Sequence, residues 1–123
     1  MNRFDLLKSI QKQIRNHHVI CNIGYPSQEL FKIDDRSNYF YMLGTMGLCS
    51  SIGLGLSLSI DEPVISIDGD GSILMNMNTL ATIGNRSPNN FTLLIIDNGS
   101  YGSTGDQKTF TNEKTSLKKG ILG

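Results

Sequence analysis

The hydrophobic positions along this chain change their spacing several times, and each change marks a different expected element. Over residues 3–16, apolar side chains recur at Phe4, Leu7, Ile10 and Ile14, which is the three- and four-residue spacing of an amphipathic helix. Three short runs are almost continuously apolar, at residues 19–21, 64–67 and 91–96. Runs of this length are typical of parallel strands that are covered on both faces, so we expect three buried strands here.

The segments between these runs predict the remaining elements. We expect helices at residues 28–32, 44–59 and 74–83, and an extended aromatic segment at 38–43. Ser27 is expected to cap the first of these helices, and Gly84 to end the last. Small and apolar residues alternate in the middle helix, which favours close packing on a sheet. Strands that alternate with helices predict one α/β domain, residues 1–123, with a doubly wound parallel sheet.

Composition narrows the classes of partner. The 11 basic and 11 acidic residues give zero formal net charge, so we expect neither nucleic acid nor membrane as a partner. The N-terminal helix lacks the unbroken apolar core of a signal peptide. Cys21 and Cys49 lie far apart in apolar runs with no metal-binding spacing, which predicts buried free thiols in a cytoplasmic protein.

Candidate chemistry begins at residues 68–72, Asp-Gly-Asp-Gly-Ser, directly after the second apolar run. A diphosphate–Mg²⁺ group needs a carboxylate for the metal and glycines that let backbone N–H groups approach the phosphate oxygens. A helix that starts just after the loop adds its dipole. An EF-hand is excluded because Ile73 and Thr79 stand where that loop needs Gly and Glu, and a dinucleotide loop fails at Leu74. A plain tight turn stays an equal alternative for this motif alone.

A second polar loop, at residues 97–102, favours the diphosphate–Mg²⁺ interpretation over a plain tight turn. Asn98 follows Asp70 by one strand–helix–strand unit, which returns the chain to the neighbouring strand end. Ligands of such sheets bind at the carboxyl ends of the strands. Since Mg²⁺ prefers a few hard oxygen ligands plus phosphate oxygens, a carboxylate, an amide oxygen and one backbone carbonyl would complete the protein side of a metal site.

Together, GDGS, a helix, a strand and then DN-GS-Y resemble the cofactor signature of thiamine diphosphate (ThDP) enzymes. The resemblance implies the diphosphate-type ThDP-binding fold, with ThDP and Mg²⁺ as cofactors. It makes Asp70, the Asn98 side chain and the Ser100 backbone carbonyl the metal ligands. The first Asn of the family's pair is Asp97 here, whereas the metal-binding second position is kept.

The same resemblance implies further cofactor contacts. In ThDP decarboxylases the glycine that corresponds to Gly44 accepts a hydrogen bond from the aminopyrimidine, and a bulky residue two positions on, here Met46, wedges the cofactor into a bent shape. Ordinary core packing is the alternative for Met46. The loop at residues 22–27 falls where the family places other diphosphate contacts. The implied cofactor-binding set is Gly24, Tyr25, Ser27, Gly44, Thr45, Met46, Gly69, Asp70, Gly71, Ser72, Asn98, Ser100, Tyr101 and Gly102.

Most of the chain is also similar to one branch of that family. The segments CNIG-x-PS-x-EL, NYFYMLGTMGL, SSIGLGL, GDGSILMN and YGSTG resemble the sulfopyruvate decarboxylase beta-subunit family, and nearly as much phosphonopyruvate decarboxylases. The resemblance implies a subunit of a ThDP- and Mg²⁺-dependent 2-oxo acid decarboxylase (a carboxy-lyase) that converts 3-sulfopyruvate into sulfoacetaldehyde and CO₂ in coenzyme M biosynthesis.

That family takes its catalytic glutamate from a separate pyrimidine-binding domain, which is absent here. None of Glu29, Glu62 and Glu113 lies in a matching motif, so we expect no catalytic residue in this chain and a pyrimidine-domain alpha subunit as its partner in a hetero-oligomer. Family members run longer, so the end at Leu122 and Gly123 indicates C-terminal truncation. The alternatives are a phosphonopyruvate decarboxylase or acetolactate synthase-like subunit and, from another class, a non-catalytic Mg²⁺–phosphate binding module or truncated remnant.

Overall fold

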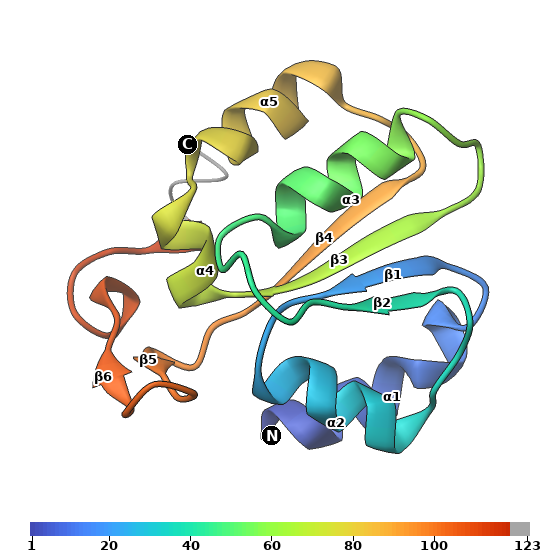
Figure 1. Cartoon of the computed structure of the whole chain (residues 1–123). Coiled ribbons are helices and arrows are strands. Elements are labelled where there is room, and N and C mark those ends of the chain that lie inside the picture. Colours follow the sequence, from blue (N-terminus) through green and yellow to red (C-terminus); the bar gives the residue numbers. More distant parts are fainter. Residues whose placement is uncertain (119–123) are drawn as a thin grey trace.

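A four-stranded parallel sheet forms the centre of the computed structural model, which describes residues 1–118 of the chain. Its strands are β1 (His18–Cys21), β2 (Tyr39–Tyr41), β3 (Val64–Gly69) and β4 (Phe91–Ile96), in the spatial order β2-β1-β3-β4. Helices α1 (Arg3–Ile14) and α2 (Tyr25–Ile33) cover one face, and α3 (Cys49–Ser57) and α5 (Asn78–Arg86) cover the other (Figure 1). The predicted doubly wound α/β fold is confirmed. The expectation about Leu122 and Gly123 lies outside the described residues.

Both faces of the central strand β1 are buried. Val19 and Cys21 pack into the hydrophobic cluster under α1 and α2, whereas Ile20 packs with Met42 and Cys49 on the face that α3 covers. This alternation explains why the run is apolar at every position. Strand β4 is the outer strand of the described sheet, and its side chains are only partly buried, with Thr92 exposed.

The starts of two helices differ from the sequence prediction. Helix α2 begins at Tyr25 rather than at residue 28, because Pro26 suits the first helical turn, and Ser27 therefore lies inside the helix. Helix α3 begins only at Cys49, since the preceding loop passes through left-handed conformations at Thr45 (φ 59°) and Gly47 (φ 98°).

The helix expected at residues 74–83 is instead two helices. Helix α4 (Asp70–Met75) starts directly at the end of β3 and stops at Asn76, whose φ of −146° and ψ of 54° break the helical path. Helix α5 then continues through Gly84 to Arg86 and ends at Ser87, which adopts a left-handed conformation. The short elements β5 (Ser100–Tyr101), β6 (Gln107–Lys108) and the 3₁₀ helix η1 (Phe110–Asn112) follow β4.

The small residues of α3 allow close packing on the sheet, as predicted. A Cβ atom on Gly53 would overlap the Ser66 side chain of β3 and would lie 2.9 Å from a ring carbon of Phe91. The Ser66 hydroxyl in turn donates to the Cys49 carbonyl at 2.9 Å, which ties the start of the helix to the strand. Glycine at position 53 is therefore required by the approach of helix to sheet.

The strand order creates a crevice at one edge of the sheet. From β1 the chain passes through α2 to β2 on one side, and from β2 it returns through α3 to β3 on the other side of β1. The loops after β1 and β3 therefore diverge, and such a switch point is where open α/β sheets bind ligands. The two cysteines are buried free thiols, as expected. No helix within residues 1–118 combines the length and apolar character needed to cross a bilayer.

Candidate functional site

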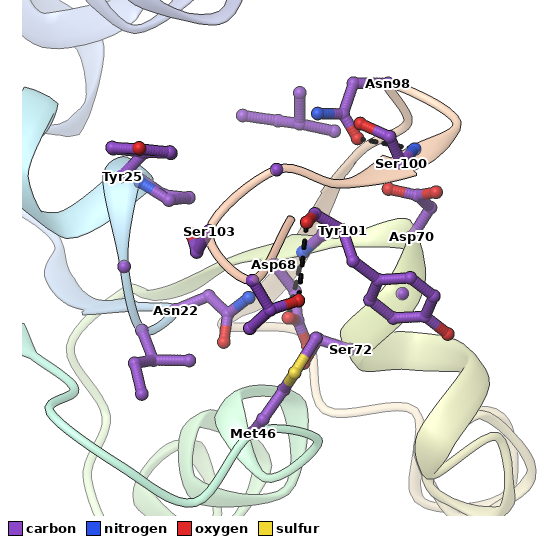
Figure 2. A pocket seen from close by; sticks show the side chains of 18 of the residues that line it. Asn22, Tyr25, Met46, Asp68, Asp70, Ser72, Asn98, Ser100, Tyr101 and Ser103 are labelled. Carbon is purple, nitrogen blue, oxygen red and sulfur yellow. Dashed lines mark hydrogen bonds between the residues drawn. The ribbon is translucent and has the colours of Figure 1, made fainter. Parts of the chain in front are cut away.

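A cavity of about 380 Å³ opens at this switch point, beyond the carboxyl ends of β1, β3 and β4. Twelve of the fourteen residues predicted to bind cofactor line it: Gly24, Tyr25, Thr45, Met46, Gly69, Asp70, Gly71, Ser72, Asn98, Ser100, Tyr101 and Gly102. The other two, Ser27 and Gly44, do not line it. The structure thus brings four loops, distant in sequence, around one cavity (Figure 2).

Asp70 provides the one carboxylate of the predicted metal site. It is only 1% exposed, and its Oδ2 accepts hydrogen bonds from the hydroxyls of Thr109 at 2.5 Å and Thr111 at 3.0 Å. None of the ion pairs formed within residues 1–118 involves Asp70. A buried carboxylate is costly without a cationic partner, so this position suits a bound cation.

Asn98 and Ser100, the other predicted metal ligands, lie on the same side of the cavity as Asp70 (Figure 2). The Asn98 Oδ1 atom accepts the Ser100 N–H at 3.3 Å, and Asn98 is exposed. The preceding Asp97, which replaces the family's first Asn, accepts the Gly99 N–H at 3.1 Å and the Thr111 hydroxyl at 2.9 Å. The Asp97 side chain therefore stabilises the loop after β4, whereas Asn98 lines the cavity.

This ligand set differs from metal sites built from several charged side chains. In the described part of the chain, no three His, Cys, Asp or Glu side chains converge where they could hold a metal. The predicted set contains one carboxylate, one amide oxygen and one backbone carbonyl. Such a set suits Mg²⁺, which usually keeps one or two carboxylates and takes its other oxygens from water and phosphate.

Gly71 and Tyr101 are in close contact at the wall of the cavity. A Cβ atom on Gly71 would overlap the Tyr101 ring, so only glycine lets the loop after β4 approach the start of α4 this closely. Gly24 is similar, because its φ is 89° and a Cβ atom there would lie 2.5 Å from the Ser103 hydroxyl oxygen. The glycines of these loops therefore permit close approach between chain segments as well as exposure of the backbone.

The loop that carries Met46 is tied to α4 by two hydrogen bonds. The Gly47 N–H donates to the Ser72 hydroxyl oxygen at 3.0 Å, and the Asn76 side-chain amide donates to the Gly47 carbonyl at 3.0 Å. Met46 lines the cavity (Figure 2) and belongs to neither hydrophobic core cluster. Gly44 is exposed at the outer end of this loop, with open space around it.

Ser27 stabilises the protein around the site without lining the cavity. Its hydroxyl lies 3.1 Å from the Cys21 carbonyl oxygen and 2.7 Å from the Asn22 carbonyl oxygen, at the end of β1. These contacts fix the point at which the chain leaves the strand. A serine inside the first turn of α2 explains both its burial and its distance from the cavity.

Several residues at the site were not among the cofactor-binding residues predicted from the sequence. Asp68 and Asn22 form part of the cavity floor and are almost fully buried, and burial raises the pKa of the Asp68 carboxyl, against hydrogen bonding by the Ser72 side chain and the Gly69 N–H. Both residues lie in segments that the sequence singles out, 68–72 and 22–27, but neither was assigned a role. Thr109 and Thr111 lie in a polar segment without periodicity, which gave no signal.

Arg3 is a further residue of the cavity wall that the sequence did not reveal. Its guanidinium makes two hydrogen bonds to the Glu29 carboxylate, at 2.7 and 3.0 Å, and lies 5.8 Å from the centre of the Tyr25 ring. This paired contact joins the start of α1 to α2. Glu29 is therefore engaged in an ion pair with Arg3.

Comparison with known proteins gives concordant matches. Residues 21–121 match the family model described as "Thiamine pyrophosphate enzyme, C-terminal TPP binding domain". The chain is 59% identical over 109 residues to sulfopyruvate decarboxylase subunit beta of Methanococcus maripaludis, covering 89% of this chain and 59% of that protein. It is 54% identical over 118 residues to the same subunit of Methanocaldococcus jannaschii, covering 95% and 63%. The chain therefore spans about three fifths of the length of these relatives.

Two further proteins match this chain at lower sequence identity. Phosphonopyruvate decarboxylase of Streptomyces viridochromogenes is 44% identical over 98 residues, covering 80% of this chain and 25% of that protein. A solved structure, described as a thiamin diphosphate-dependent enzyme isolated from Mycobacterium smegmatis, superposes with a TM-score of 0.79 at 16% identity, over 100% of this chain and 25% of that one. This second match confirms the fold.

Proposed function

Because this chain belongs to the family of thiamine pyrophosphate enzyme C-terminal TPP-binding domains, we propose that it holds ThDP and Mg²⁺ for a 2-oxo acid decarboxylase. The observation that carries the proposal is the buried Asp70 carboxylate, which lines the cavity at the switch point of the sheet without a cationic partner among residues 1–118. A diphosphate–Mg²⁺ group supplies the missing positive charge together with its own phosphate oxygens.

In this proposal the protein ligands of Mg²⁺ are the Asp70 carboxylate, the Asn98 amide oxygen and the Ser100 backbone carbonyl. The backbone N–H groups of residues 69–72 and of the loops at Gly24 and Gly102 surround the diphosphate. All of these residues line one cavity. The Asn98 Oδ1 atom accepts the Ser100 N–H and has a second lone pair with which it can bind the metal.

The loop before α3, which carries Gly44, Thr45 and Met46, is assigned to the aminopyrimidine end of the cofactor. Met46 supports the bent cofactor shape, and the Gly44 carbonyl accepts a hydrogen bond from the aminopyrimidine. Thr45 and Tyr101 complete the wall between these two regions, and Ser27 acts indirectly by fixing the loop after β1. When bound, ThDP supplies the electron sink that makes loss of CO₂ from a 2-oxo acid possible.

We further propose that the chain acts as a beta subunit on 3-sulfopyruvate, in coenzyme M biosynthesis in the cytoplasm. The names of relatives that are 59% and 54% identical support this substrate. The catalytic glutamate would come from a pyrimidine-domain alpha subunit, since Glu29 is paired with Arg3 in this chain. Phosphonopyruvate is the second candidate substrate, supported by the 44% identical relative that carries this name.

Calorimetric titration of the chain with ThDP, in excess Mg²⁺ and in excess EDTA, tests the cofactor proposal. We expect binding that requires Mg²⁺ and that disappears in Asp70→Asn, because the substitution removes the charge but keeps an acceptor for Thr109. Asp61→Asn, on an exposed turn after α3, is the matched control and should bind as the unaltered chain does. Retention of Mg²⁺-dependent binding in Asp70→Asn would refute the metal assignment.

The substrate is tested separately with the assembled complex. The chain is mixed with an alpha subunit that carries a pyrimidine domain, and CO₂ release is measured from 3-sulfopyruvate and from phosphonopyruvate. We expect release from 3-sulfopyruvate by the mixture and none by this chain alone. Turnover by the isolated chain would contradict the assignment of the catalytic glutamate to a partner. Cofactor binding without CO₂ from either substrate would favour a non-catalytic Mg²⁺–phosphate binding module.

A further inference from the structure

The segment after β6 is hydrogen-bonded both to the Asp70 carboxylate and to the loop that carries the other two proposed metal ligands. We infer that Thr109 is a positioning residue for the Asp70 carboxylate, and that this residue sets the preference of the site for Mg²⁺ over Ca²⁺. The inference rests on the proposed function, because it takes Asp70 as a metal ligand. It adds a residue that lies outside the GDGS and DN-GS motifs and does not itself contact the metal.

The backbone and the side chain of Thr109 connect two separate loops. Its N–H donates to the Gly99 carbonyl at 3.0 Å, and Gly99 stands between the two proposed ligands Asn98 and Ser100. Its hydroxyl donates to Asp70 Oδ2 at 2.5 Å, from a side chain that is only 1% exposed. The pairing of β5 with β6, which sets Ser100 opposite Lys108, holds Thr109 at this position. One residue therefore connects the Asp70 carboxylate to the loop that carries the other two proposed ligands.

Thr109 and Thr111 are not equivalent in this cluster. The Thr111 hydroxyl lies 3.0 Å from Asp70 Oδ2, 2.9 Å from Asp97 Oδ1 and 2.7 Å from the Thr109 hydroxyl oxygen, so its single proton has three acceptors. The contacts of the Thr109 hydroxyl include one carboxylate, that of Asp70. The proton of Thr109 is thus assigned to Asp70, while Thr111 also links the cluster to the loop after β4.

Both threonine hydroxyls contact the same carboxylate oxygen. Because Oδ2 of Asp70 accepts these hydrogen bonds, Oδ1 is the oxygen that is free to bind a cation. The carboxylate therefore binds the metal through one oxygen. Mg²⁺ requires near-ideal octahedral geometry, whereas Ca²⁺ accepts more ligands and often takes both oxygens of one carboxylate. A fixed single oxygen therefore favours Mg²⁺. Loss of the Thr109 hydroxyl leaves Oδ2 with only the shared proton of Thr111, which makes the two-oxygen mode that Ca²⁺ uses more accessible.

The test measures metal-dependent ThDP binding by the full chain assembled with its pyrimidine-domain partner, with Mg²⁺ and Ca²⁺ titrated separately. Thr109→Val keeps the size of the side chain but removes the hydroxyl. We expect the Mg²⁺ affinity to fall by about 10-fold to 100-fold, as is typical when the partner of a metal ligand is lost, and the Ca²⁺ affinity to change by much less. Thr109→Ser keeps the hydroxyl and should restore the preference for Mg²⁺.

Thr82→Val provides a matched control, because Thr82 is exposed on α5 and should bind both metals as the unaltered protein does. Thermal unfolding of each variant checks the fold. If Thr109→Val does not fold, the comparison of Thr109→Ser with Thr109→Ala gives the same measurement, since only serine keeps a hydroxyl.

Two results would overturn the inference: an equal loss of Mg²⁺ and Ca²⁺ affinity on removal of the hydroxyl, or no recovery with Thr109→Ser. The proposed function fails by a different result, which is Mg²⁺-dependent binding that is absent from the unaltered protein or retained in Asp70→Asn. The two failures are therefore distinguishable within one set of titrations.

Discussion

Two glycines on helix α3 should respond in opposite ways to the same substitution. Gly53 faces the sheet, and an added Cβ atom would overlap the Ser66 side chain and approach the Phe91 ring to 2.9 Å. Gly55 is exposed two residues later, and an added Cβ atom would meet nothing within 4 Å. We therefore expect Gly53→Ala to destabilise the protein and Gly55→Ala to stabilise it.

The magnitudes follow from opposing contributions. Replacing glycine by alanine inside a helix gains up to about 1 kcal/mol from helix propensity at either position. At Gly53, overpacking of the interface costs about 1–3 kcal/mol. If Ser66 rotates away to make room, its hydrogen bond to the Cys49 carbonyl is lost as well, at a cost of about 1 kcal/mol. The expected result is a net destabilisation of about 1–3 kcal/mol for Gly53→Ala and a stabilisation of about 0.5–1 kcal/mol for Gly55→Ala.

Urea unfolding followed by far-UV circular dichroism measures both free energies of unfolding. This probe is suitable because the chain contains no tryptophan. The two variants share a helix and a substitution, so the difference between them reports the contact with β3 and cancels the effect of helix propensity. A Gly53→Ala variant as stable as the unaltered chain would refute the close packing of α3 on the sheet.

The buried thiols and the turn before β4 provide two further predictions. Burial raises the pKa of both thiols, that of Cys21 to about 12, so neither Cys21 nor Cys49 should react with a thiol reagent until the protein unfolds, as a thiol titration with and without denaturant would show. The unfolded thiols ionise first, so the thermal midpoint should fall as the pH rises from about 9 towards 12, and a midpoint that does not change there would contradict this. Asn90→Ala removes a side-chain amide whose nitrogen lies 2.9–3.1 Å from the carbonyl oxygens of Ser57, at the end of α3, and of Ile60 and Glu62, and should cost about 1–3 kcal/mol in the urea assay. Asn89→Ala, at an exposed neighbouring position, should have little effect.

The strands of the sheet were predicted well because a strand that is buried on both faces is apolar at nearly every position of the sequence. Residues 19–21 are apolar at every position since α1 and α2 cover one face of β1 and α3 covers the other. The loops of the site were found by a different signal, the glycines and polar residues directly after apolar runs. Parallel strands place all their carboxyl ends at one edge, so positions such as Asp70 and Asn98 were expected on one cavity wall, where both lie.

Helix boundaries were predicted less well because local conformation decides them. The alternation of small and apolar residues continues through the loop before α3, but left-handed turns at Thr45 and Gly47 delay the helix to Cys49. Hydrophobic spacing alone does not reveal such turns. The same holds for Ser27, whose residue type suits a helix cap but which lies within the first turn of α2, directly after Pro26.

The residues that the sequence did not reveal act through contacts between distant segments. Thr109 reaches Asp70 only because the β5–β6 hairpin folds back on the end of β3. Arg3 reaches the cavity because α1 packs on α2. Neither residue stands in a motif or in a periodic pattern, so their positions depend on the tertiary fold and are not evident from local sequence.

The hydrogen bonds that join the Gly47 loop to α4 have a consequence for binding energetics. Ser72 and Asn76 hold both polar groups of the Gly47 backbone, so the loop proposed for one end of the cofactor and the segment proposed for the other form a single unit. A ligand fragment that displaces one part must also break bonds to the other. Contributions from the two ends of the cofactor are then thermodynamically linked, and neither can be assigned independently by measuring fragments alone.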